Sequence, residues 1–293
     1  MAETGRPVLD FAVVGDDFKT LATAVENKIE REFPRALDSI SGLRYLVLAH
    51  VKITRNTSEV IRYLCADQPE DPWRKPGFCI AVFPLARTVL ESLYSVLFLL
   101  DDPTTRAPWF ERASWRDDCE ELERLSGVYG SDPNWSSFLD KRRALLTAAA
   151  ASMGLSPEEQ ANPRKLRYWP IPGQMIRGTD LGSSLRPYFK YLAEWFYGKL
   201  SAASHHAGPR LIPAMQILSD DLPEGPFALS VALYRSEAIF TSLTLHLALL
   251  SECISAFGFD LRPKAQYLWA VLGQYWPPTK ALYEKRYAAL LQV

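Results

Sequence analysis

Apolar side chains recur every three to four residues along most of this 293-residue chain, which predicts amphipathic helices. Sustained alternation of apolar and polar residues is missing, as are Asn-Gly and Asp-Gly turns, so strands are not expected. We therefore expect an all-α fold, a single bundle of about eight to ten helices over residues 1–293. The expected helices are 16–32, 35–66, 78–101, 105–127, 135–152, 185–204, 210–218, 227–257 and 263–291.

Two segments break this periodicity. Residues 67–77 are rich in proline and charge and predict a loop. Residues 154–184 carry repeated prolines and glycines among Tyr168, Trp169 and Met175, and we expect an irregular segment over one end of the bundle. A loop of this length is often a functional lid or docking segment. The alternative is a well-packed connector that its aromatic residues hold in place.

The helix expected at 78–101 is apolar on nearly every face, yet it contains Arg87 and Glu91 one turn apart. Such a helix is normally buried, and an unpaired buried ion is strongly destabilising, so the two charges should pair. Arg before Glu at this spacing is the less favourable order with respect to the helix dipole, so surface solubility is a poor explanation. We expect a buried structural or functional site here.

Two further expected helices each carry a polar stripe. The stripes consist of Glu194, Tyr197, Ser201 and His205 on 185–204, and of Arg235, Ser242 and His246 on 227–257. Neighbouring helices of a bundle often build a site from inward-facing side chains, so we expect these lines to converge with the first pair. Arg87 would then bind an anionic group that Glu91 helps to orient, and His205 would act as acid or base. The alternative is three separate networks, with His205 as a helix cap.

Two short motifs lie at these positions, Leu85-Ala-Arg87-Thr-Val-Leu-Glu91 and Tyr197-Gly-Lys-Leu200-Ser201-Ala-Ala-Ser-His205. With them, residues 40–260 resemble a bacterial family of all-helical domains of unknown function, whose pattern is R-x-x-x-E on one helix and Y-x-x-L-S-x-x-x-H on a later one. The resemblance marks Arg87, Glu91, Ser201 and His205 as a set. The family's usual His-Pro is His205-His206 here, so either imidazole could hold the role.

A weaker similarity is to the HEPN (higher eukaryotes and prokaryotes nucleotide-binding) ribonucleases and toxins. Their motif places a His four to six residues after an Arg, and Arg44-Tyr-Leu-Val-Leu-Ala-His50 has that spacing. The resemblance implies metal-free RNA cleavage, in which the Arg holds the phosphate and the His moves protons. Tyr45 stands where those proteins usually have a polar residue.

Metal and cofactor chemistry is not expected. Asp117-Asp-Cys-Glu-Glu121 has the D-D-x-x-E spacing that holds Mg²⁺ in terpene synthases, but it lies in a charge-dense run typical of a solvated helix face. The second metal-binding motif of those enzymes is missing. The four histidines form no H-E-x-x-H, the cysteines form no C-x-x-C, and there is no glycine-rich phosphate loop.

Composition bounds the remaining possibilities. The chain is 48% hydrophobic and 23% charged with a formal net charge of −1, which argues against broad attraction to DNA or to anionic membranes. Four widely spaced cysteines indicate free thiols, and no secretory signal is visible, so we expect a cytoplasmic protein. Two functions stay open. One is phosphodiester cleavage in RNA in a defence or toxin setting, and the other is a non-catalytic scaffold or sensor. A homodimer is compatible with either.

Overall fold

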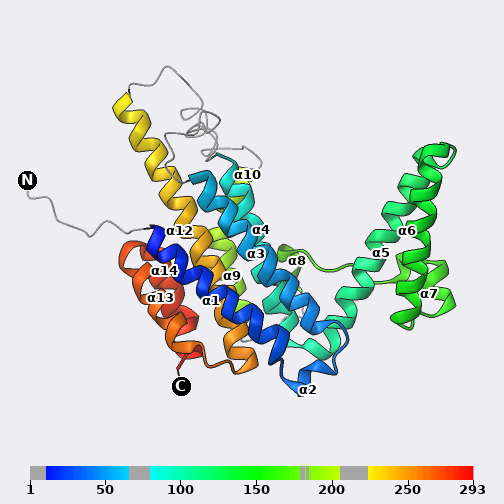
Figure 1. Cartoon of the computed structure of the whole chain (residues 1–293), viewed down its shortest axis with the longest axis horizontal. Helices are drawn as coiled ribbons and strands as arrows, with labels where there is room; N and C mark the ends of the chain where they lie inside the picture. Colours follow the sequence, from blue (N-terminus) through cyan, green and yellow to red (C-terminus); the bar gives the residue numbers. More distant parts are fainter. Residues whose placement is uncertain (1–10, 66–79, 179–181, 183–184, 205–223, 293) are drawn as a thin grey trace, which may run out of the picture.

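Every regular element of the described residues is helical, which confirms the all-α prediction. The computed structural model describes residues 11–65, 80–178, 182, 185–204 and 224–292. Figure 1 shows a helical body on the left and a slender helical arm that projects from it to the right. The expected loop 67–77 and the expected helix 210–218 lie outside the described residues.

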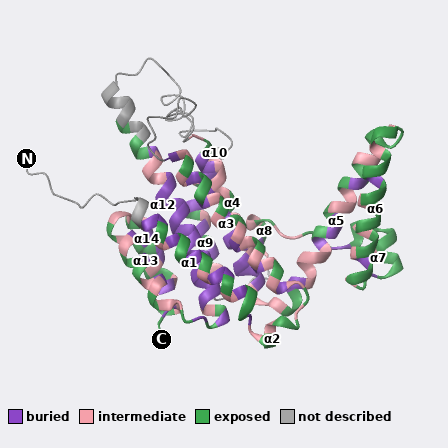
Figure 2. Ribbon diagram, in the orientation of Figure 1, coloured by how far each residue is buried: buried purple, intermediate pink, exposed green. Residues whose placement is uncertain are grey.

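Four helices form the centre of the body: α1 (Phe11–Arg31), α3 (Leu43–Cys65), α4 (Val82–Asp101) and α12 (Glu224–Phe257). The helices α3, α4 and α12 pack against one another, and α1 lies across α3 and α12. Their facing sides form one hydrophobic core, in which Figure 2 shows the buried residues to be concentrated. Each large apolar side chain fully buried there contributes about 1.5–3 kcal/mol.

The two most apolar helices fill this core. By length and composition alone, α4 and the part of α12 from Ala232 to Phe257 could cross a membrane. The other helices of the body nevertheless cover them, since 67% of the apolar window of α4 and 94% of that of α12 are buried. They are packed as the sequence predicts for core helices.

Several of the expected helices are divided. The region 35–66 forms a short α2 (Arg35–Asp38) and then α3, and Gly42 directly before α3 has a φ of +71°, a backbone conformation that suits glycine and interrupts the helix there. The region 263–291 is broken at Trp276, after which Pro277 opens a new helix. Its parts are α13 (Arg262–Tyr275), α14 (Pro277–Leu282), the π-helical η5 (Tyr283–Tyr287) and α15 (Ala288–Leu290).

The arm is a helical hairpin with a core of its own. It consists of α5 (Pro103–Tyr129), α6 (Pro133–Ser152), α7 (Pro157–Ala161) and the 3₁₀ turn η2 (Pro163–Lys165). The carboxylates of Asp102 and Asp132 cap α5 and α6 by accepting backbone N–H bonds of 3.3 and 2.9 Å. A second, small hydrophobic cluster of Trp115, Ala150, Leu155 and Leu166 joins these elements.

The segment 154–184 is less irregular than the sequence predicts. It contains α7, η2 and α8 (Pro172–Arg177), helices too short to show a hydrophobic period. A capping box between Ser156 and Glu159 starts α7. The chain then runs back along α5, and Trp169 packs its ring at 4.8–5.4 Å from those of Phe98, Trp109 and Phe110. This packing favours a pinned connector over a lid.

Candidate functional site

Arg87 and Glu91 form the expected ion pair, but the pair is not buried. The Arg87 Nε donates to Glu91 Oε1 at 2.8 Å, while 23% of the Arg87 side chain and 44% of the Glu91 side chain are exposed. The expectation of a buried pair is therefore wrong. Most of the α4 surface is covered by other helices, but the face that carries these two residues lies at the edge of the body.

A tyrosine from a later helix reaches the pair. The region 185–204 divides into α9 (Arg186–Leu192), the π-helical η3 (Ala193–Tyr197) and α10 (Gly198–Ser204), and α10 packs against α4. Tyr197, the last residue of η3, accepts a hydrogen bond of 3.3 Å from Arg87 Nη2, and its ring centroid lies 5.3 Å from the Arg87 guanidinium carbon. π-Helical turns are rare and often occur at functional sites. Here the turn joins α9 to α10 and places Tyr197 against Arg87 of α4.

Other expected site residues lie at the same end of the bundle. Ser201 is half-buried on α10, one turn beyond Tyr197, and Arg235 is half-buried in the first half of α12. Lys199 of α10 forms an ion pair with Glu237 of α12, which joins these two helices. His205 and His206 lie outside the described residues. The structure thus brings Arg87, Glu91 and Tyr197 into contact and places Ser201 and Arg235 on the helices around them.

His246 lies elsewhere, although it shares a stripe with Arg235 in the sequence. It is only 2% exposed, its ring lies 6.2 Å from that of Phe18 on α1, and neither ring nitrogen has a hydrogen-bond partner in the described structure. Burial, with a smaller contribution from the charge of Arg55, lowers the pKa of His246 to about 3. Eleven residues of helix, about 16 Å, separate it from Arg235. The expected convergence therefore does not include His246.

Arg44 and His50, which carry the HEPN resemblance, face different neighbours on α3. Arg44 pairs with Asp38 at 3.5 Å and lies over the ring of Tyr45. The His50 ring lies edge-on to Phe110 of α5 at 6.0 Å, and burial lowers its pKa to about 4. Six residues of helix turn the two side chains about 120° apart. The RNA-cleaving chemistry implied by this resemblance remains a prediction.

A charged network between α12 and η5 escapes sequence analysis. Arg286 of η5 binds Glu252 of α12 through two bonds of 2.5 and 2.8 Å, and Glu252 is 5% exposed. The Arg286 guanidinium also lies over the ring of Tyr188, whose hydroxyl is 2.7 Å from that of Tyr287. Burial raises the pKa of both tyrosines well above the usual value. The sequence shows that Glu252 lies in an apolar helix and needs a cationic partner, but it does not show that the partner is Arg286.

The arm ends in an aromatic cluster that the sequence analysis also missed. Tyr129 at the end of α5 stacks on Trp135 of α6, with ring centroids 4.2 Å apart and planes 9° apart. Phe138 lies edge-on to Trp135 at 5.6 Å. These rings are not covered by the body, since 37% of Tyr129 and 46% of Phe138 are exposed, and the adjacent Val128 is 64% exposed. We refer to Val128, Tyr129, Trp135 and Phe138 as the tip cluster.

The acidic run in α5 holds the arm together. Arg142 of α6 binds Asp118 at 2.8 Å and Glu121 at 2.7 Å, so two carboxylates of the run are engaged in the hairpin. In the described parts of the chain, no three His, Cys, Asp or Glu side chains are grouped so that they could hold a metal ion. Comparison with protein-family models, curated proteins and solved structures finds no match to this chain.

Proposed function

We propose that this protein is a non-catalytic interaction protein, a scaffold or adaptor, whose arm docks a partner protein through the tip cluster. One observation carries the proposal, namely that three packed aromatic rings stand at the end of a projecting hairpin without cover from the body. Aromatic residues are enriched at the centres of protein interfaces, where a few of them supply most of the binding energy.

The tip cluster has the properties of a preformed contact surface. Because Trp135 packs between Tyr129 and Phe138, the rings are ordered before any partner arrives, which reduces the entropy lost on binding. Asp132 caps α6 directly beside them, so the turn between the helices is also fixed. Packing of the arm's own core does not require this exposure, because that core is built from Trp115, Ala150, Leu155 and Leu166.

The contacts of Arg87 have a structural role in this proposal, because they hold two parts of the body together. Arg87 contacts Glu91 on its own helix and both the hydroxyl and the ring of Tyr197 on η3. These contacts tie α4 to the segment that leads into α10. Of the two histidines in the described residues, His246 is buried and His50 is half-buried, and desolvation lowers the pKa of both, so both are uncharged at neutral pH and unsuited to donating a proton to a substrate.

Site-specific photo-crosslinking in cells of the native host tests the docking proposal. A benzophenone amino acid is introduced in the full chain at Val128 in the tip cluster, and in a control at Tyr267, which is 55% exposed on α13. We expect a discrete protein adduct at Val128 that Phe138→Asp removes, and none of the same mass at Tyr267. An adduct that forms equally at both positions, or that survives Phe138→Asp, would refute docking at the tip.

The second candidate function is RNA phosphodiester cleavage at the end of the bundle where α4, α10 and α12 meet. It is favoured by one observation, that Arg87 contacts Tyr197 while Ser201 lies one turn further along the same chain toward His205. Purified Arg87→Ala, His205→Ala and His206→Ala variants would be compared with the wild type for melting temperature and RNase activity. Intact melting with lost cleavage would support this candidate, and a wild type without cleavage would reject it.

A further inference from the structure

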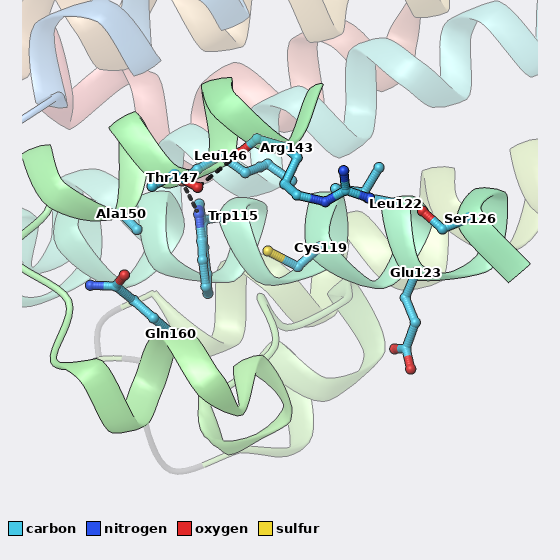
Figure 3. A pocket seen from close by; sticks show the side chains of 10 residues that line it. All are labelled: Trp115, Cys119, Leu122, Glu123, Ser126, Arg143, Leu146, Thr147, Ala150 and Gln160. Atoms are coloured by element: carbon cyan, nitrogen blue, oxygen red, sulfur yellow. Dashed lines mark hydrogen bonds between the residues drawn. The ribbon is translucent and has the colours of Figure 1, made fainter. Parts of the chain in front are cut away.

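A pocket of about 360 Å³ opens on the arm between α5, α6 and α7 (Figure 3). This volume lies within the range of small-molecule sites. The space exists because the part of α6 that lines the pocket carries small side chains, Thr147 and, in the run of four alanines that follows it, Ala150. It is separate from the tip cluster and from the Arg87 site.

The inner wall of the pocket is apolar and rigid. Trp115, Leu122 and Ala150 are at most 9% exposed, and the indole Nε1 of Trp115 donates to the Leu146 carbonyl at 2.9 Å. This bond fixes the indole and satisfies its only polar group. Burial raises the pKa of the Cys119 thiol to about 11, so this side chain is an uncharged part of the wall at neutral pH. An aromatic ring would find flat apolar surface here.

The rim of the pocket offers hydrogen-bond donors to an anionic group. Its cation is Arg143, which runs along the pocket toward Leu122 in Figure 3. Arg143 donates from Nη1 to Asp140 at 2.7 Å, and its other N–H donors have no acceptor among the described residues. The one carboxylate of the rim, Glu123, points away from the pocket and binds Arg164 at 3.2 Å.

We propose that this pocket binds a small aromatic molecule with a single negative charge, such as an aromatic carboxylate or sulfonate. Its ring lies against Trp115, and its anionic group is held by Arg143. Gln160 donates its Nε2 to the Leu155 carbonyl, so its side-chain oxygen remains as an acceptor for a polar substituent. The ligand bridges α5 and α6, so its binding stiffens the hairpin that carries the tip cluster.

The probe for this site is 1-anilinonaphthalene-8-sulfonate, with the uncharged N-phenyl-1-naphthylamine as its matched partner. We expect the sulfonate to bind the full chain at one saturable site. In a ¹H–¹⁵N NMR spectrum it should also shift the indole N–H cross-peak of Trp115. This peak is assigned by its disappearance in Trp115→Phe. Arg143→Gln should weaken the sulfonate about fivefold, as expected for one exposed ionic contact, and leave the uncharged dye unchanged. Lys141→Gln, on the same helix outside the pocket, is the charge control and should have no effect.

A second experiment fills the pocket with a larger side chain. Thr147 is exposed, and among the described residues its hydroxyl bonds only to the Arg143 carbonyl, so Thr147→Phe should fold and abolish the Trp115 shift. Ala148→Phe is the control: it adds a ring of the same size on the outer face of α6, and the Trp115 shift should remain. Sulfonate binding that survives Thr147→Phe would overturn the site, and equal binding of the two dyes would overturn its anionic preference. Neither result bears on crosslinking at Val128, which tests partner docking separately.

Discussion

The stability of this protein should fall steeply between pH 7 and pH 5 because of His246. The folded structure holds the pKa of this imidazole at about 3, against 6.5 for an unperturbed histidine. Between these values the unfolded chain binds a proton that the folded chain does not, so stability falls as the pH falls below 6.5. Full stability from this group is present above that pH. Its loss by pH 5 amounts to about 2 kcal/mol.

Urea unfolding of His246→Leu and of the wild type at several pH values measures this loss. The leucine removes the titrating group and two ring nitrogens that have no partner in the described structure, so stability at pH 7 should be equal or higher by up to about 2 kcal/mol. Between pH 7 and pH 5 the variant should lose about 2 kcal/mol less than the wild type. His50→Leu is a parallel variant: because the pKa of His50 is lowered to about 4, this variant should also lose about 2 kcal/mol less stability than the wild type between pH 7 and pH 5. Parallel profiles of His246→Leu and the wild type would refute the reasoning.

Three further predictions concern contacts that hold the body together. Arg286→Met leaves Glu252 buried without its partner and should lower the free energy of unfolding by about 3–5 kcal/mol. Arg286→Lys keeps a positive charge and should lose less stability than Arg286→Met. A loss below about 1 kcal/mol for Arg286→Met, as for an exposed ion pair, would contradict the network. Trp169→Ala should lower the free energy of unfolding in urea by about 1–3 kcal/mol, because its ring is half-buried, and should increase proteolysis between the arm and the body. Neither change is expected if the segment is a lid rather than a pinned connector. A double-mutant cycle of Arg87→Gln and Tyr197→Phe should give a coupling energy of about 0.5–1 kcal/mol, and zero coupling would mean that this contact contributes nothing.

Contacts within one helix could be predicted from the sequence. The pairing of Arg87 with Glu91 follows from their spacing, because residues four apart share a face wherever the helix packs. The all-α fold follows from the hydrophobic period in the same way. The helix starts at Pro103 and Pro133 lie two residues before the expected ones, although their signal is local, since an aspartate followed by proline is a cap and first-turn signal.

Properties that depend on the neighbours of a helix could not be predicted. The exposure of Glu91 depends on which helix covers that side of α4, and the inward orientation of His246 depends on the rotation of α12 against α1 and α3. Neither is encoded in spacing. The projecting arm had one readable signal, the lack of a continuous apolar face on α6, of which only Leu139 and Ala150 are buried. Such a helix cannot lie in the core of the body.

The affinity of the full chain for the protein crosslinked at Val128 tests docking by the tip cluster most directly. Titration calorimetry would compare the wild type with Phe138→Ala in the cluster and with Leu145→Ala, which removes a 71%-exposed side chain elsewhere on the same helix. We predict that Phe138→Ala weakens binding by about tenfold or more, the effect of an interface hot spot, and that Leu145→Ala changes it by less than about twofold. Equal effects of the two substitutions, or none from Phe138→Ala, would contradict the assignment of the tip cluster as the docking site.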